Sequence, residues 1–304
     1  MKWTDDTERT WAKLEPKVSG DMAAVRHEVG LSDAEGAAML PVVGRVACWI
    51  AERMPADHVP LVAVSGAQGT GKSTVARLIS FLLERGFGSC ILTLSIDDFY
   101  LTREERRQLG ESVHPLFATR GVPGTHDMTL LRQVIDAAQA GQPIAVPRFD
   151  KSVDDRGAPE QWQGPADLII LEGWCVGVGP MDPATLAEPM NRLEAVKDGD
   201  GRWRGYVQAR LGDADYRAVF GAFDSHVFLA APGMPAVVAW RTRQEALLEQ
   251  KTGRRLMSPE QIEEFVMHYE RVTKHALASV PGTADIVIAL DEDHRMMGVT
   301  SKHG

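Results

Sequence analysis

The sequence has few cysteines, a single asparagine and no excess of positive charge, and each shortage excludes a class of protein. Its three cysteines stand singly in or beside apolar runs, without a C-x-x-C pair, which predicts buried thiols in a reducing compartment. The one asparagine, Asn191, is followed by Arg-Leu-Glu, so the N-K-x-D motif of guanine-specific GTPases is absent. The net charge of −9 argues against a general nucleic-acid binder, because such proteins are usually basic.

The sequence also lacks a long hydrophobic run. Residues 1–6 are acidic and contain no apolar core of a signal peptide, and no apolar stretch approaches the length of a membrane span. We therefore expect a cytoplasmic protein that does not cross a membrane. A chain of 304 residues is long enough for one large α/β domain or two small ones, and an anionic substrate would need a local cationic pocket.

A phosphate-binding motif dominates what is present. Residues 65–74 read SGAQGTGKST, which is a complete G-x-x-x-x-G-K-[ST] loop between an apolar strand pattern at 61–64 and a helical pattern from residue 75. Backbone N–H groups of such a loop surround the α- and β-phosphates, the lysine reaches the β- and γ-phosphates, and the following hydroxyl binds Mg²⁺. The predicted nucleotide ligands are Gly66, Ala67, Gln68, Gly69, Thr70, Gly71, Lys72, Ser73 and Thr74.

The remaining pattern predicts a P-loop NTPase fold with a mainly parallel sheet, helices on both faces and an N-terminal helical extension. Near-continuous apolar runs at 90–96, 144–147, 168–171, 227–230 and 285–290 alternate with helical stretches, as in a sheet covered on both sides. We divide the chain into a helical extension, residues 1–58, and a kinase-like domain, residues 59–304. A capping pattern at Ser258, Pro259 and Gln261 predicts a late helix. Segments 101–127 and 148–166 are expected to be loops over a site, and 180–215 a surface insertion.

Two acidic positions follow predicted strands. Asp97 and Asp98 end the second strand, where a carboxylate can take a proton from an attacking hydroxyl or hold the metal shell, or can simply cap the next helix. Glu172 ends the apolar run LIIL, as the acid of a Walker B strand does, and would reach Mg²⁺ through water or position Asp97. These acids predict chemistry at the carboxyl edge of the sheet.

Basic residues gather in two regions. One set lies in the predicted site loops, and the other lies on and after a helix starting near Pro235, where an arginine-bearing lid over residues 235–258 could stabilise a transferring phosphoryl group. A solvated helix face is the alternative, and Arg241 and Arg243, two residues apart, cannot both point the same way. The pair His126–Asp127 could bond a hydroxylated substrate or form a helix-capping turn. The two basic sets are Arg120, Arg148 and Lys151, and Arg241, Arg243, Lys251, Arg254 and Arg255.

With these residues assembled, the chain resembles the D-glycerate 3-kinases, within the phosphoribulokinase/uridine kinase group of P-loop kinases. The resemblance extends from about residue 61 to 290 and is carried by unusual strings in the expected order. The strings are SGAQGTGKST (65–74), LSIDDFYLT (94–102), RGVPGTHD (120–127), VPRFDKS (146–152), LIILEGWCVG (168–177) and VVAWRTRQE (237–245).

The resemblance implies an ATP- and Mg²⁺-dependent kinase that transfers the γ-phosphate to the 3-hydroxyl of D-glycerate. It implies that Lys72 and Ser73 handle phosphate and metal, and that Asp97 is the base. Glu172 would be the Walker B acid, so that Ser73, Glu172 and Asp97 form the metal shell, and Arg241 would belong to the lid. The expected acceptor ligands are Tyr100, Arg120, His126, Asp127, Arg148 and Lys151.

Other functions stay open at this point. Another small hydroxylated acceptor, such as a nucleoside, pantothenate or ribulose phosphate, would fit the same fold, although arginine-rich loops favour an anion. A transport ATPase is disfavoured because no L-S-G-G-Q string is present. A P-loop protein that binds a partner without catalysis is disfavoured by the intact Lys72, Asp97 and Glu172.

Overall fold

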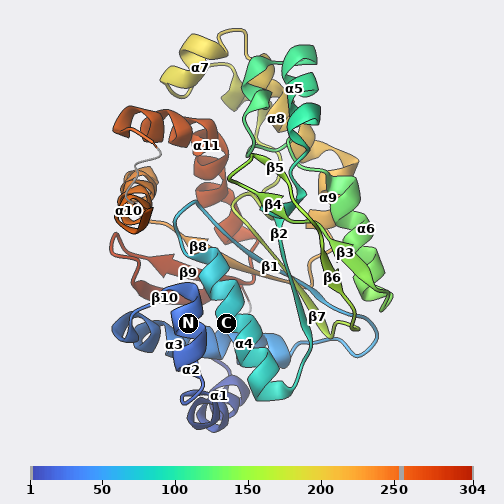
Figure 1. Cartoon of the computed structure of the whole chain (residues 1–304). Helices are drawn as coiled ribbons and strands as arrows, with labels where there is room; N and C mark the ends of the chain where they lie inside the picture. Colours follow the sequence, from blue (N-terminus) through green and yellow to red (C-terminus); the bar gives the residue numbers. More distant parts are fainter. Residues whose placement is uncertain (1–2, 253–256, 303–304) are drawn as a thin grey trace.

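The computed structural model describes residues 3–252 and 257–302, and a six-stranded sheet lies at its centre (Figure 1). The strand order is β10-β9-β8-β1-β7-β2, and every neighbouring pair is parallel except β9 with β10. This is the predicted α/β P-loop fold. The strands are β1 (Leu61–Gly66), β2 (Ile91–Ser95), β7 (Leu168–Gly173), β8 (Ser225–Ala230), β9 (Ile286–Leu290) and β10 (Met296–Ser301).

Helices cover both faces of this sheet, because the central strands are apolar on both sides. In β1, Val62 and Val64 belong to one hydrophobic cluster, whereas Leu61 and Ala63 belong to the other. The first cluster includes side chains of α1 (Asp5–Val18), α2 (Met22–Val29), α3 (Asp33–Ala51), α4 (Lys72–Phe87) and α10 (Met234–Thr252). The second includes side chains of α6 (Met128–Gln139), α8 (Arg202–Gly212), α9 (Ala214–Phe220) and α11 (Pro259–Ser279).

The N-terminal helices share their core with the nucleotide-binding fold. Helix α3 begins at the predicted capping box, in which Ser32 and Glu35 bond each other's backbone N–H groups. Trp11 of α1 is buried against α3 at Gly44, where a Cβ atom would lie 2.1 Å from the indole ring. The division at residue 58 stays a prediction, since α1–α3 and α4 contribute to one continuous cluster.

Helix α3 departs from the expectation that no apolar stretch is long enough to cross a membrane. Its 19 residues meet that criterion by length and hydropathy, and they are the one helix among the described residues that does. In the structure Val43, Val46 and Ile50 of this helix are buried against the rest of the first cluster. The apolar face of α3 is therefore an internal packing surface here.

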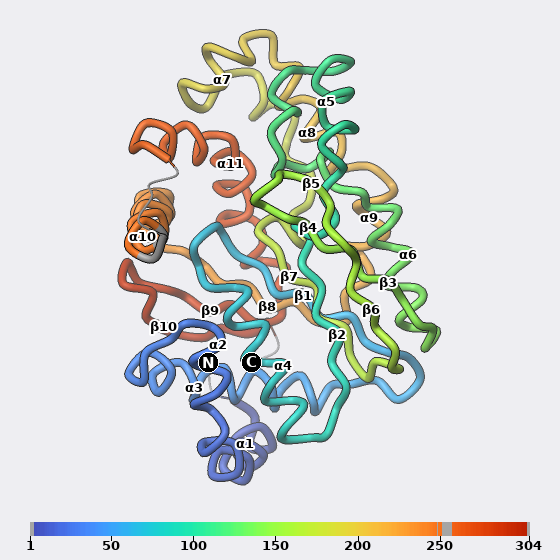
Figure 2. Tube along the Cα trace, viewed as in Figure 1, coloured from blue at the N-terminus to red at the C-terminus, as the bar shows by residue number. Residues whose placement is uncertain are grey.

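Several expected loops contain regular structure. Segment 101–127 holds α5 (Arg103–Ser112), and the strand expected at 144–147 does not join the main sheet: β3 (Ile144–Val146) pairs antiparallel with β6 (Glu160–Trp162). A second short ribbon joins β4 (Phe149–Asp150) to β5 (Asp155–Arg156). Both ribbons lie on the β2 side of the main sheet (Figure 2). The short 3-10 helices are η1 (Ile96–Phe99), η2 (Pro115–Ala118), η3 (Pro183–Leu186) and η4 (Val280–Gly282).

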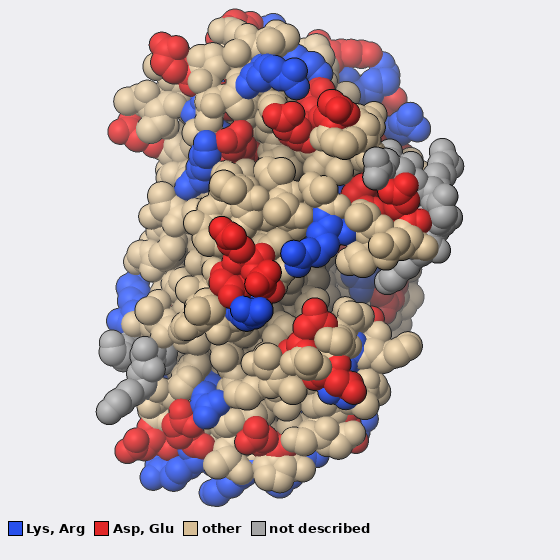
Figure 3. Space-filling model, turned by 90° about the vertical axis from the view of Figure 1, so that its left-hand side faces the viewer, with Lys and Arg blue, Asp and Glu red and all other residues tan. Residues whose placement is uncertain are grey.

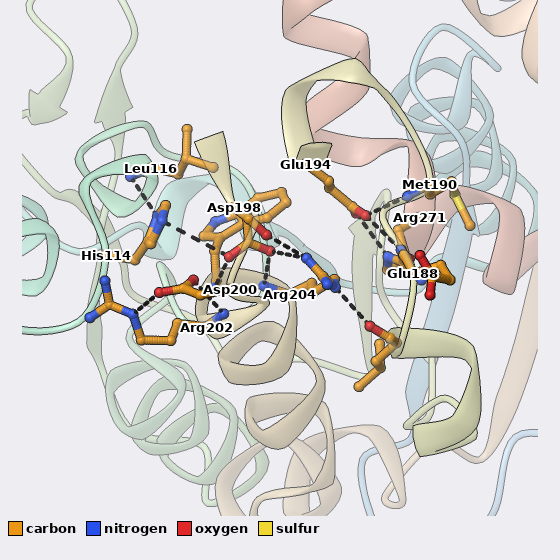
Figure 4. A network of polar contacts seen from close by, with 12 residues as sticks. His114, Leu116, Glu188, Met190, Glu194, Asp198, Asp200, Arg202, Arg204 and Arg271 are labelled. Carbon is orange, nitrogen blue, oxygen red and sulfur yellow. Dashed lines mark hydrogen bonds and ion pairs between the residues drawn. The ribbon is translucent and has the colours of Figure 1, made fainter. Parts of the chain in front are cut away.

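Segment 180–215 is packed, contrary to the expected surface insertion. It contains α7 (Arg192–Lys197) and α8, and two buried ion pairs tie it down (Figure 4). Arg271 of α11 donates to both carboxylate oxygens of Glu194, at 2.8 and 2.6 Å, and Arg204 donates to Asp198 at 2.9 Å. Satisfied charges of this kind hold α7 and α8 against α11 in one arrangement. Of the three cysteines, Cys48 and Cys175 are buried as predicted, but Cys90 is exposed.

Candidate active site

The phosphate loop connects the end of β1 to the start of α4. Gly69 and Gly71 adopt φ values of 82° and 80°, in the region that glycine enters without strain. The Thr70 hydroxyl donates to the Ala67 carbonyl at 2.8 Å and closes the turn. The backbone N–H groups at the start of α4 are thereby presented to an anion at a helix N-terminus.

Two residues that the motifs did not reveal, His294 and Trp240, support the back of this loop. His294, in the β9–β10 connection with φ 65°, contacts the Gly69 carbonyl through Nε2 at 2.6 Å. Its ring stacks on Trp240 of α10 with centroids 4.1 Å apart, and the Trp240 indole donates to the Glu292 carbonyl at 2.8 Å. Helix α10 and the β9–β10 hairpin therefore meet at the phosphate loop.

The two adjacent acids after β2 point to different partners. Asp97 accepts a hydrogen bond from the Tyr100 hydroxyl on Oδ1 and from Lys151 Nζ on Oδ2, each at 2.8 Å. Asp98 instead accepts from the backbone N–H of Phe149 at 3.0 Å and from Arg148 at 2.7 Å. Asp97 thus belongs to the cleft, whereas Asp98 fixes the β4–β5 ribbon.

The electrostatic surroundings favour an ionised Asp97. Burial raises the pKa of its carboxyl, but the charges of Lys151 and Lys72 and the hydrogen bonds from Lys151 and Tyr100 outweigh burial and lower that pKa to about 2. Burial raises the pKa of Tyr100 well above its ordinary value, so its hydroxyl stays protonated and donates to Asp97.

Glu172, at the end of β7, lies opposite the phosphate loop. Ser73 donates to Glu172 Oε1 at 3.0 Å, and Glu172 Oε2 is buried without a hydrogen-bond partner among the described residues. A buried carboxylate oxygen without a partner is costly unless a ligand meets it. A hydroxyl and a carboxylate side by side are also the oxygen donors that Mg²⁺ prefers, so these two residues fit that ion.

These groups line one cleft of about 540 Å³ at the carboxyl edge of the sheet. It unites the predicted Lys72, Ser73, Asp97, Glu172 and Arg241 with three of the expected acceptor ligands, Tyr100, Arg120 and Lys151. Aromatic side chains that were not among the predicted site residues, Trp174, Phe265 and Tyr269, complete the walls. The further lining residues are Gln68, Gly69, Ser95, Trp174, Gln244, Glu245, Met257, Phe265 and Tyr269.

The other three expected acceptor ligands lie outside the lining. Asp127 caps α6 by accepting from the Leu130 N–H at 2.9 Å and pairs with Arg156, also at 2.9 Å. Arg148 pairs with Asp98 and Glu160. The structure therefore gives Asp127 and Arg148 structural partners in place of a direct approach to the cleft.

His126 lies directly behind the cleft wall. Its ring stacks on Tyr100 with centroids 4.8 Å apart, and burial lowers its pKa to about 4. Tyr216 Oη accepts from the Gly124 N–H and forms a hydrogen bond with His126 Nδ1 at 3.0 Å. His126 Nε2 is a buried atom with no hydrogen-bond partner among the described residues.

Arg241 and Arg243 of α10 point in different directions, as their spacing predicted. Arg241 lines the cleft, lies over the Phe265 ring at 5.2 Å and contacts Glu245 at 3.3 Å, whereas Arg243 is exposed. The described residues do not include Arg254 and Arg255 of the second basic set, or the side chain of Lys251.

A second group of possible ligands has a structural explanation. His114, Asp198 and Asp200 bring ligand atoms within 4.8 Å of one another (Figure 4). However, His114 Nδ1 accepts from the Leu116 N–H at 3.3 Å, which leaves the ring proton on Nε2, facing Asp198. Asp198 also accepts from the Trp203 N–H at 2.7 Å. This cluster caps the start of α8.

On the face drawn in Figure 3, basic side chains are scattered among acidic ones, and the described residues there form no continuous positive surface. The cationic groups that matter lie in the cleft. The phosphate loop follows a buried parallel strand and faces Asp97, Glu172 and Arg241 across the cleft. This arrangement defines the site of a P-loop kinase.

Comparison with known proteins narrows this class, although no protein-family model matches the chain. The uncharacterised kinase mug58 of Schizosaccharomyces pombe is 35% identical over 227 residues, which cover 69% of this chain and 78% of that protein. The chloroplastic D-glycerate 3-kinase of Arabidopsis thaliana is 29% identical over 259 residues, 78% of this chain and 54% of that protein. The structure of D-glycerate 3-kinase from Cryptococcus neoformans matches with a TM-score of 0.72 at 25% identity, over 86% of this chain and 99% of that one.

The chain belongs to the D-glycerate 3-kinase family of P-loop kinases. It is an ATP-dependent phosphotransferase that acts on a small molecule.

Proposed function

We propose that this kinase transfers the γ-phosphate of ATP to the 3-hydroxyl of D-glycerate and releases 3-phosphoglycerate and ADP. One observation carries the proposal. The cleft that holds the phosphate-loop lysine and the acid Asp97 also holds two further cations, Arg120 and Lys151, on the acceptor side. A small acceptor with a carboxylate at one end and a hydroxyl at the other matches that distribution of charge.

The groups in the cleft have complementary roles in the transfer. The acceptor oxygen attacks the γ-phosphorus while its proton passes to Asp97, and the bond from that phosphorus to the ADP oxygen breaks. Lys72 and Arg241 face the negative charge that gathers on the phosphoryl oxygens. We assign Tyr100 to positioning, because its hydroxyl orients the Asp97 carboxylate.

Magnesium is part of this proposal. Ser73 and Glu172 would hold the ion, because the pair supplies a hydroxyl and a buried carboxylate oxygen that has no hydrogen-bond partner within residues 3–252 and 257–302. The ion would neutralise charge on the phosphates of ATP. Asp97 was also expected in the metal shell; we assign it instead to the acceptor hydroxyl, because its Oδ2 faces Lys151 on the acceptor side of the cleft.

An ADP-release assay with ATP–Mg²⁺ and a panel of acceptors tests the proposal. The panel contains D-glycerate, L-glycerate, uridine, pantothenate and ribulose 5-phosphate, with Asp97→Asn as the blank. We expect Asp97-dependent turnover with D-glycerate. Turnover with another acceptor and none with D-glycerate would discard the substrate while keeping the kinase mechanism.

A further inference from the structure

Both oxygens of the proposed base are occupied in this structure. Tyr100 donates to Asp97 Oδ1 and Lys151 donates to Oδ2, each at 2.8 Å. A general base must approach the proton it removes to hydrogen-bond distance. Each carboxylate oxygen can accept one further hydrogen bond, but a hydroxyl that enters the cleft meets the Lys151 ammonium at Oδ2 or the Tyr100 hydroxyl at Oδ1 and competes with that donor for Asp97.

Packing decides which donor can leave. Tyr100 is 3% exposed, stacks on His126 and meets the Phe149 ring edge-on at 5.2 Å, so its movement would disturb both aromatic contacts. The Lys151 side chain is 61% exposed and has a flexible stem. Lys151 can turn away from Asp97 at little cost.

The backbone that carries Lys151 is held in place independently of this ion pair. Lys151 lies in the turn between β4 and β5, and Asp154 in the same turn is bonded to Arg106, whose side chain is fully buried. Arg106 donates to the Asp154 carbonyl at 2.6 Å and to its carboxylate at 3.1 Å. Only the lysine side chain has to move to free Asp97.

The second cation of the acceptor side shares this anchor. Arg120 pairs with Asp154 and lines the same cleft as Lys151. A negative group bound at Arg120 would therefore lie within the reach of the Lys151 ammonium group, and it would compete with Asp97 for that ammonium.

We propose that Lys151 locks the general base, by holding Asp97 in an ion pair until the acceptor binds, and that the anionic group of the acceptor releases it. The acceptor's anion takes up the ammonium, and Oδ2 of Asp97 becomes free for the acceptor's hydroxyl. A neutral alcohol or a water molecule offers no such anion, so the lock remains closed. Lys151 thus determines specificity in two ways, by favouring anionic acceptors and by suppressing hydrolysis of ATP. The acceptor part of this inference rests on the proposed function.

The hydrolysis part can be tested without any acceptor. In the unwanted reaction a water oxygen attacks the γ-phosphorus, its proton passes to Asp97, and the bond to the ADP oxygen breaks, which yields phosphate and ADP. Lys151→Met should raise acceptor-free ADP release by about tenfold, a fraction of the hundredfold or more that a positioned base contributes. Lys151→Arg keeps a cation on the turn and should raise acceptor-free ADP release less than Lys151→Met does.

Two further variants make the result specific. Lys197→Met removes another exposed lysine that pairs with a carboxylate, Glu264, and neither residue lines the cleft, so hydrolysis should stay unchanged. The double variant Lys151→Met/Asp97→Asn should lose the increase, because the increase requires the unlocked base. Acceptor-free hydrolysis in Lys151→Met that is unchanged or slower than in the wild type would overturn the lock.

Acceptors then separate this inference from the proposed function. Glycerol carries the hydroxyl without the anion, so Lys151→Met should gain turnover with glycerol and lose turnover with D-glycerate. If D-glycerate is no substrate of the wild type but hydrolysis rises in Lys151→Met, the lock stands and the substrate assignment falls. If D-glycerate is phosphorylated but hydrolysis does not rise, the substrate stands and the lock falls.

Discussion

Replacing Asp97 by asparagine tests the centre of the proposed mechanism. The change removes the proton acceptor while Tyr100 can still donate to the remaining side-chain oxygen. Lys151 loses its ionic partner, but its side chain is exposed and can turn to solvent. Nucleotide binding should stay near that of the wild type, because the phosphate loop makes its contacts through backbone N–H groups and Lys72.

The expected loss of turnover is on the order of a hundredfold or more, which is the contribution of a positioned general base. A hundredfold corresponds to about 2.7 kcal/mol of lost transition-state stabilisation. The assay measures ADP release with saturating ATP–Mg²⁺ and D-glycerate, together with a separate titration of ATP binding.

Asp98→Asn is the matched control, since it makes the same change one residue away. Asp98 bonds the Phe149 N–H and Arg148, outside the cleft lining, so its replacement should cost much less turnover. Turnover near the wild-type level in Asp97→Asn would remove this residue from its role. A loss in Asp98→Asn as large as in Asp97→Asn would show that the ribbon, and not the base, limits the reaction.

Three other outcomes follow from the contacts described. Lys72→Ala should weaken ATP binding and turnover together, and undiminished binding of ATP–Mg²⁺ in a direct titration would contradict our placement of the phosphates. Trp11→Ala should lower the free energy of unfolding by about 3–5 kcal/mol in urea titrations, because it empties a buried site against α3, and a negligible change would show that α1 is not part of the core. The low pKa of Asp97, about 2, adds folding stability above its ordinary pKa of 3.8, and this stability is lost as the pH falls from about 4 to about 2, where the native carboxylate is protonated. Urea midpoints of the wild type and Asp97→Asn should therefore converge over that interval, and a constant difference between them would contradict the low pKa.

Local chemistry made the phosphate loop, the central strands and α11 predictable. A glycine-rich turn followed by Lys72 and Ser73 has one common geometry, and Ser258 with Gln261 forms the expected capping box at the start of α11. Helix α5 was missed because its sequence, REERRQLGES, has almost no apolar face, and it is stabilised by its own capping box at Thr102 and Glu105. Strand β10 was missed because it is an exposed edge strand with no continuous apolar run.

The aromatic wall of the cleft was hidden for a different reason. Phe265 and Tyr269 follow the helical period of α11, so the sequence indicates a buried helix face and cannot show that this face borders a site. Trp174, two residues after the β7 acid Glu172, likewise resembles a core residue. The Tyr269 hydroxyl donates to the Arg120 carbonyl at 3.1 Å, which joins that wall to the cationic side of the cleft.

The pairing of the cationic side chains with carboxylates was the least predictable part of the site. It limits how much negative charge an acceptor can bring into the cleft. The sequence offered Arg120, Arg148 and Lys151 as equivalent cations, but Arg148 is neutralised by Asp98 and Glu160 outside the cleft. Arg120 and Lys151 each already face one carboxylate, from Asp154 and Asp97. Few uncompensated positive charges then remain for the acceptor, since Lys72 and Arg241 are needed by the phosphates of ATP. Such a balance suits one carboxylate better than the doubly charged phosphate of a sugar phosphate, which is consistent with the proposed acceptor, D-glycerate.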